Sequence, residues 1–86
     1  MKLKKSDEFV EQLAELLKNS PGLYKKVKRI IENIVTGRTF AFNKGKKLKY
    51  SPNRYSARID RKNRLIYDRF DDLIVLISCK GHYEDK

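Results

Sequence analysis

The chain has 86 residues, 40% of them hydrophobic, one cysteine and a formal net charge of +10. This length holds one domain, expected over residues 1–86, and the lone Cys79 excludes an internal disulfide and a cysteine-based zinc site. No apolar run approaches the roughly 20 residues that cross a bilayer, and no secretion signal opens the chain, so we expect a cytoplasmic protein without a membrane segment.

Two amphipathic helices are predicted in the first part of the chain. Residues 2–5 fit a short edge strand, after which Ser6 is the expected N-cap of a helix whose apolar residues recur at helical spacing as far as Asn19. The Ser20–Pro21 pair predicts the start of a second helix, and Gly37 its C-cap. Because the connection is short, we expect an antiparallel helical hairpin that covers one face of a sheet.

The pattern changes to strands in the second half. Residues 39–53 have no period and contain glycine, proline and lysines, which predicts a loop. Residues 55–60 alternate between apolar and polar, as in a half-buried strand, and after a turn at 61–63 the segment 64–69 predicts the return strand. Residues 73–78 form an aliphatic run, expected of a central strand covered on both faces. The fold class is therefore α+β, with a helical hairpin on a small antiparallel sheet built from a three-strand meander and an N-terminal edge strand.

Almost all the excess positive charge lies between residues 38 and 64. This stretch holds ten basic residues against one acid, Asp60, a balance of +9, whereas residues 1–20 balance to zero. Such a concentration suits a polyanion, because each neutralised phosphate releases counterions. An acidic protein, an anionic membrane surface or a solvated lysine-rich loop would explain the same pattern.

Four residues of the meander suggest a site for phosphodiester cleavage. A turn at residues 61–63 brings Arg58 and Arg64 near the same end of neighbouring strands, and His82 and Tyr83 follow the third strand. Arginine holds phosphate and stabilises transition-state charge, histidine moves protons near neutral pH, and tyrosine stacks on bases or orients a phosphate. If a 2′-hydroxyl is the nucleophile, such a site needs no metal.

The same residues allow a purely structural interpretation. Arg58 and Arg64 could face Asp60 and Asp68 on the sheet surface, a lone histidine is often an ordinary surface residue, and the cysteine is most simply a small buried hydrophobe. The residues alone leave both interpretations open.

Three motifs follow one another over residues 55–83: Tyr55-Ser-Ala-Arg-Ile, Asn63-Arg-Leu-Ile-Tyr and Cys79-Lys-Gly-His-Tyr. Together they resemble the YoeB/Txe family of toxins in the RelE/ParE superfamily, and the two preceding helices are similar to that family's order. The resemblance implies a RelE-like fold and a ribosome-dependent, metal-independent endoribonuclease that cuts A-site messenger RNA by 2′-hydroxyl attack and needs no cofactor. It also implies a type II toxin–antitoxin system with a cognate antitoxin, the ribosome and mRNA as partners, and it allows a homodimer.

By position, the resemblance makes Arg64 the catalytic arginine, His82 the general acid and Tyr83 the terminal tyrosine. The family has a general-base glutamate before its first long strand, where this chain has Lys46, and no acid occurs between residues 34 and 59. A deprotonated lysine, Arg64 acting with ribosomal RNA groups, or an inactive protein would each account for this departure. The residues expected to bind RNA are Lys44, Lys47, Lys49 (also a candidate base), Arg54, Arg58 and Lys80.

Two rival functions remain on this fold. One is a non-catalytic toxin like the gyrase-poisoning ParE branch, against which the His82–Tyr83 ending argues. The other is a plain RNA- or ribosome-binding module, which would bind without cutting.

Overall fold

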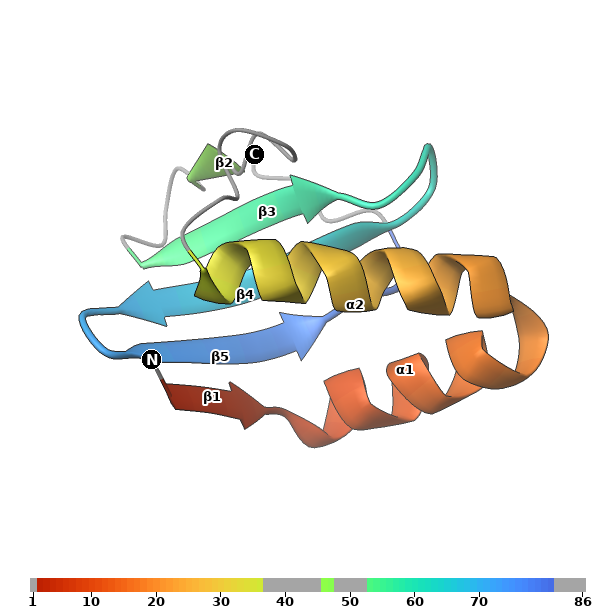
Figure 1. Ribbon diagram of the computed structural model, residues 1–86, viewed down its shortest axis with the longest axis horizontal. Helices are drawn as coiled ribbons and strands as arrows, with labels where there is room; N and C mark the ends of the chain where they lie inside the picture. Colours follow the sequence, from red (N-terminus) through yellow and green to blue (C-terminus); the bar gives the residue numbers. More distant parts are fainter. Residues whose placement is uncertain (1, 37–45, 48–52, 82–86) are drawn as a thin grey trace.

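The computed structural model describes residues 2–36, 46–47 and 53–81. The elements of these ranges are, in chain order, β1 (Lys2–Lys5), α1 (Asp7–Asn19), α2 (Pro21–Val35), β2 (Lys46–Lys47), β3 (Arg54–Arg58), β4 (Arg64–Phe70) and β5 (Leu73–Ser78). Both helices lie on the same side of one sheet (Figure 1). The predicted α+β fold, with a helical hairpin on a sheet, is confirmed.

The sheet has the strand order β1-β5-β4-β3-β2. Strands β3, β4 and β5 form the predicted antiparallel meander, with Tyr55 opposite Tyr67 and Arg58 opposite Arg64. Strand β1 joins the edge of β5 in parallel, with Lys2 opposite Leu73. The predicted edge strand is thus confirmed, and its parallel pairing makes the sheet mixed.

Two strand predictions need correction. The loop predicted over residues 39–53 contains β2, which pairs antiparallel with β3 and is too short to produce a sequence period. Strand β5 is internal, as predicted, but its two faces are not equally covered. Ile74 and Leu76 are fully buried, whereas Val75 and Ile77 are only half-buried, because the helices cover one face of the sheet.

The expected helix starts are present. The Ser6 hydroxyl accepts the Phe9 N–H at 3.0 Å, and it donates to the Ile77 carbonyl at 2.7 Å, so this cap also ties α1 to β5. Helix α2 begins at Pro21 and has Thr36 as its C-cap, whereas the predicted C-cap Gly37 lies outside the described residues.

The core lies between the two helices and one face of the sheet. Its side chains on the sheet come from alternate positions, including Ala57 and Leu65, and the rings of Tyr55 and Tyr67 stack with centroids 5.7 Å apart. The buried residues of this core are Phe9, Leu16, Val27, Ile30, Ile34, Ala57, Ile59, Leu65, Tyr67, Ile74, Leu76 and Cys79, whereas Ile66 is buried on the other face of the sheet. Since successive strand residues point to opposite faces, the residues between these sheet positions on β3 and β4 point away from the helices.

Candidate functional site

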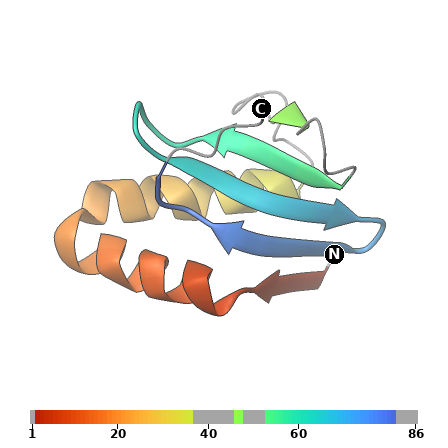
Figure 2. The ribbon, with the colours of Figure 1, turned by 180° about the vertical axis from the view of Figure 1, so that it is seen from behind.

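The face of the sheet that lies away from the helices carries most of the polar strand residues. We call it the open face; Figure 2 shows it with no helix in front of the sheet. On β3 and β4 it consists of Arg54, Ser56, Arg58, Arg64, Ile66 and Asp68. Both arginines of the predicted cleavage site therefore lie on one surface, near the turn that joins β3 to β4.

A hydrogen bond across the two strands holds Arg64 in place. The Arg64 Nε donates to the hydroxyl of Ser56, a side chain that is only 2% exposed. No carboxylate forms an ion pair with Arg64 in the described ranges, so its terminal guanidinium nitrogens remain available. The result is an oriented cation with two donor groups, which suits a phosphate.

Arg58 lies directly opposite Arg64 and is exposed. The acids that could have paired with these arginines are engaged elsewhere. Burial opposes the charge of Asp60, but the N–H groups of Lys62 and Asn63 donate to its carboxylate at 2.8 and 2.7 Å and hold its pKa below the ordinary value. Neither arginine is thus neutralised by an acid of the described residues.

Two of the residues expected to bind RNA are instead in ion pairs. Arg54 donates to both carboxylate oxygens of Asp68, at 2.8 and 3.0 Å, and Lys80 pairs with Glu15 of α1. Because these charges are compensated, Arg54 and Lys80 fit phosphate binding less well than Arg58 does.

Gly81, the last described residue, is hydrogen-bonded to Asn63 and Arg64. The Gly81 N–H donates to the Asn63 side-chain oxygen at 2.9 Å, and the Arg64 N–H donates to the Gly81 carbonyl at 3.1 Å. Gly81 has φ +90°, which a glycine adopts at little cost. The β3–β4 turn and the chain after β5 are therefore joined at two points.

The remaining predicted residues are only partly placed. His82, Tyr83, Lys44 and Lys49 lie outside the described residues. Lys46 and Lys47 form β2, and Lys46 lies opposite Ser56 in the sheet register.

Sequence reasoning missed Ser56 and Asn63 as parts of the site. Both occur in the motifs that carry the resemblance, which was the available signal. Their roles depend, however, on hydrogen bonds to Arg64 and Gly81, which the sequence pattern alone does not reveal.

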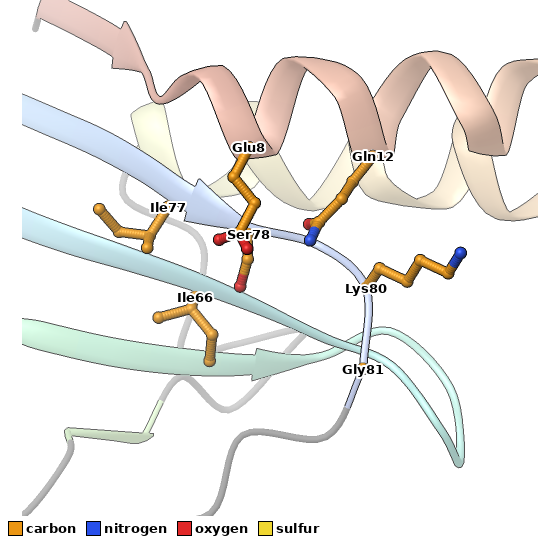
Figure 3. Close-up of a pocket in the computed structure, with 7 residues that line it drawn as sticks. All are labelled: Glu8, Gln12, Ile66, Ile77, Ser78, Lys80 and Gly81. Atoms are coloured by element: carbon orange, nitrogen blue, oxygen red, sulfur yellow. The ribbon is translucent and has the colours of Figure 1, made fainter.

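Two cavities open at opposite ends of β4. One, of about 330 Å³, is lined by Glu8, Gln12, Ile66, Ile77, Ser78, Lys80 and Gly81 (Figure 3). The other, of about 430 Å³, is lined by Asn53, Tyr55, Arg69, Phe70 and Asp71. Only the first reaches Gly81 and so adjoins the Arg64 end of the open face.

Other chemistry has little support among the described residues. Within them, no three side chains of histidine, cysteine, aspartate or glutamate gather to hold a metal ion, and no helix is long and apolar enough to span a membrane. Cys79 is fully buried, and burial raises the pKa of its thiol to about 11, which suits a packing residue rather than a nucleophile.

Comparison with known proteins shows which family and fold this chain resembles. The family model for the YoeB-like toxin of bacterial type II toxin–antitoxin systems matches residues 6–83. Among solved structures, the YoeB dimer from Staphylococcus aureus is 27% identical with a TM-score of 0.86, over 96% of this chain and 98% of that one. A YoeB–YefM complex from the same organism is 28% identical with a TM-score of 0.83, over the same shares of the two chains.

A more distant structure shares the fold. The YoeB/ParE toxin from Agrobacterium tumefaciens is 23% identical with a TM-score of 0.84, over 96% of this chain and all of that one. Among curated proteins, none matches this sequence.

Proposed function

The chain belongs to the YoeB-like toxin family of bacterial type II toxin–antitoxin systems, and on that basis we propose that it is a ribosome-dependent endoribonuclease that cuts A-site messenger RNA. The observation that carries this proposal is the arrangement of Arg64. It is oriented by Ser56, is unpaired by any acid of the described residues, and lies beside the chain that leads into His82.

The proposed reaction is an internal transfer at one phosphodiester. The 2′-hydroxyl attacks the adjacent phosphorus, the bond to the 5′-oxygen breaks, and the products are a 2′,3′-cyclic phosphate and a 5′-hydroxyl. Arg64 stabilises the extra negative charge on the phosphoryl oxygens, through donors that are already oriented before the reaction starts. This preorganisation is what the hydrogen bond from Arg64 to Ser56 supplies.

Proton transfer would fall to His82 and a lysine. His82 follows Gly81 directly, and consecutive Cα atoms are about 3.8 Å apart, so a Gly81 fastened beside Arg64 supports His82 as the acid that protonates the leaving 5′-oxygen. Tyr83 would orient the substrate. The register of Lys46 opposite Ser56 favours it over Lys49 as the group that removes the 2′-hydroxyl proton.

The remaining cations would hold the RNA on either side of the cut. Arg58, together with Lys44, Lys47 and Lys49, would bind flanking phosphates and so add a salt-dependent term to the affinity. Arg54 and Lys80 would contribute only by exchanging their present carboxylate partners.

Two protein partners accompany this function. We propose a cognate antitoxin, because a relative from Staphylococcus aureus was solved in complex with YefM, and a homodimer, because another structure from that organism is a YoeB dimer. Substrate contact requires a cytoplasmic location, where translating ribosomes are found.

A ribosome-binding toxin that does not cut is the second candidate. The observation that favours it is the lysine at position 46 in place of the family's glutamate.

Primer extension on a reporter mRNA in a translating extract separates the two functions. Wild type is expected to produce discrete cuts at ribosome-occupied codons. Arg64→Ala and His82→Gln should abolish them, while Arg29→Ala, which removes an exposed cation on α2, should not. Inhibition of translation without cuts would instead establish a binding toxin.

A further inference from the structure

Asn63 closes the turn between β3 and β4, and the fold uses every polar group of this residue. Its backbone carbonyl accepts the N–H groups of Ile59 and Asp60 at 3.0 and 3.2 Å. Its own N–H donates to the Asp60 carboxylate at 2.7 Å, and its side-chain NH₂ donates to both oxygens of that carboxylate at 3.1 and 3.3 Å. The side-chain oxygen accepts the Gly81 N–H at 2.9 Å. Asn63 is therefore fixed within its turn while it binds the chain that follows β5.

The Asp60 carboxylate decides which way the Asn63 amide faces. An amide can be rotated by 180°, which exchanges its oxygen and its NH₂ group. A carboxylate is only an acceptor, so it binds the NH₂ group and directs the amide oxygen toward the Gly81 N–H. The same carboxylate accepts the Lys62 N–H at 2.8 Å, which restrains its own rotation. Asp60 thus orients the group that holds Gly81.

Gly81 directly precedes His82, and both of its backbone polar groups are held. Its N–H is bound by Asn63, and its carbonyl accepts the Arg64 N–H at 3.1 Å. Its φ of +90° is a conformation that favours glycine. The Gly81 carbonyl belongs to the planar peptide unit that links this residue to the next one. The two hydrogen bonds therefore restrict the direction in which the chain leaves Gly81.

That direction matters for an acid that follows immediately. A general acid has to come within hydrogen-bond reach of the oxygen that it protonates. Displacing a reacting group by about 1 Å can slow a reaction about 100-fold. Because Asn63 and Arg64 are consecutive, one end of β4 holds both the proposed arginine and the start of the segment that carries the proposed acid.

We propose that Asn63, oriented by Asp60, is a positioning residue that places His82 for proton transfer beside Arg64. The inference rests on the proposed function, in which His82 is the general acid. Asn63 touches no reacting atom in this role and acts only through Gly81. In the rival role, Asn63 merely stabilises the β3–β4 turn, and its loss would lower the stability of the protein without slowing the reaction of the folded molecule.

Single-turnover primer extension at increasing toxin concentration separates the two roles. Asn63→Ala should lower the saturated cleavage rate about tenfold, because a misplaced acid loses part of the roughly 10²–10⁴-fold that general acid–base catalysis supplies. The toxin concentration that gives half of that rate should stay close to wild type, because the cations that bind phosphate are intact. Asn19→Ala, at the exposed end of α1, is the matched control and should cleave like wild type. An unchanged saturated rate in Asn63→Ala would overturn the proposal.

An exchange of the two side chains tests the hydrogen bonds themselves. Asn63→Asp brings two carboxylates together, and Asp60→Asn leaves the Asn63 amide without the acceptor that orients it, so each single variant should be slow. The double variant, Asp60→Asn with Asn63→Asp, again pairs an amide with a carboxylate and presents an oxygen to Gly81 at the same net charge. It should recover most of the wild-type rate. A folded double variant that is no faster than the single variants would reject the proposal.

The chain has a single histidine, which gives a readout that does not need cleavage. The carbon–proton NMR signals of the His82 ring should move in Asn63→Ala and return in the double variant. The Gly81 amide should exchange with solvent faster in Asn63→Ala than in wild type. Ring signals that stay unchanged in Asn63→Ala would overturn the proposal. Ring signals that follow these hydrogen bonds in a protein that cuts no RNA would instead reject only the nuclease function.

Discussion

The two faces of β4 have different surroundings although their residues alternate along one strand. Leu65 is fully buried against the helices, and its neighbour Arg64 lies on the open face with its guanidinium bound to Ser56. The helix side is apolar and stabilises the fold, whereas the open side keeps a cation oriented and available. Neighbouring residues of one strand thus belong to the core and to the proposed site, and we expect substitutions on the two faces to produce different kinds of loss.

The largest effect on stability is expected at Leu65. Leu65→Ala removes a fully buried side chain and leaves a cavity, which should lower the free energy of unfolding by about 2–5 kcal/mol. That is a large share of the roughly 5–15 kcal/mol typical of a domain. Urea unfolding followed by circular dichroism measures the change. Arg64→Ala is the matched control and should shift the free energy by less than about 1 kcal/mol. Similar losses for the two variants would contradict the division between faces.

The largest effect on the reaction is expected at Arg64, without loss of the fold. Arg64→Lys keeps the charge but loses both the fork of donors and the Nε that binds Ser56. Cleavage at ribosome-occupied codons should fall about 100-fold, comparable with the loss of one transition-state donor. Single-turnover primer extension gives the rate, and the unfolding midpoint should stay close to wild type. Full activity in this variant would show that any positive charge suffices at this position.

A smaller effect is expected at Ser56, which acts through Arg64. Ser56→Ala removes the acceptor of the Arg64 Nε and should slow cleavage about tenfold, since the guanidinium is then free to rotate. The decisive measurement is a double-mutant cycle: Ser56→Ala should have no further effect in an Arg64→Ala background, provided that residual cleavage is measurable. Equal effects in both backgrounds would mean that the serine only stabilises the strand.

The smallest effect concerns Cys79, on the buried side of the molecule. Burial raises the pKa of its thiol from 9.0 to about 11, so between these values the folded protein keeps a proton that the unfolded chain releases. The free energy of unfolding should therefore fall as pH rises through that window and be unaffected by this group below it. Urea unfolding at pH 8 and pH 10 should show a smaller fall for Cys79→Ala than for wild type. Identical slopes would place the thiol in contact with solvent.

Much of the fold follows from local pattern. Helical spacing, the Ser6 cap and the proline at position 21 locate both helices, and alternation between residues 55 and 60 locates a strand and the face that it buries. These features depend on neighbours in sequence. A partner distant in sequence leaves no such trace, so the parallel pairing of β1 with β5 and the two-residue β2 could not be derived.

The candidate site shows the same limit. The position of Arg64 at the start of a strand is predictable, because the turn before it is local information, whereas its role stays a prediction. The contact of Ser56 with the Arg64 side chain can be predicted only when the strand register is known. The ion pair of Lys80 with Glu15, 65 residues away, can be predicted only when the packing of α1 against the end of β5 is known. Composition counts such a lysine as free charge, whereas the folded protein compensates it.

The pairing of β1 with β5 also affects the order in which the protein can be assembled. Residues 2–5 leave the ribosome well before their strand partner β5, and Ser6 leaves it 71 residues before its acceptor Ile77. Strand β5 also joins β1 to the meander, so the five-strand sheet cannot close while that segment is still inside the exit tunnel. Strand β1 and the Ser6 hydroxyl therefore have no partner in the sheet until β5 has emerged, whereas β3 and β4 can already pair with each other.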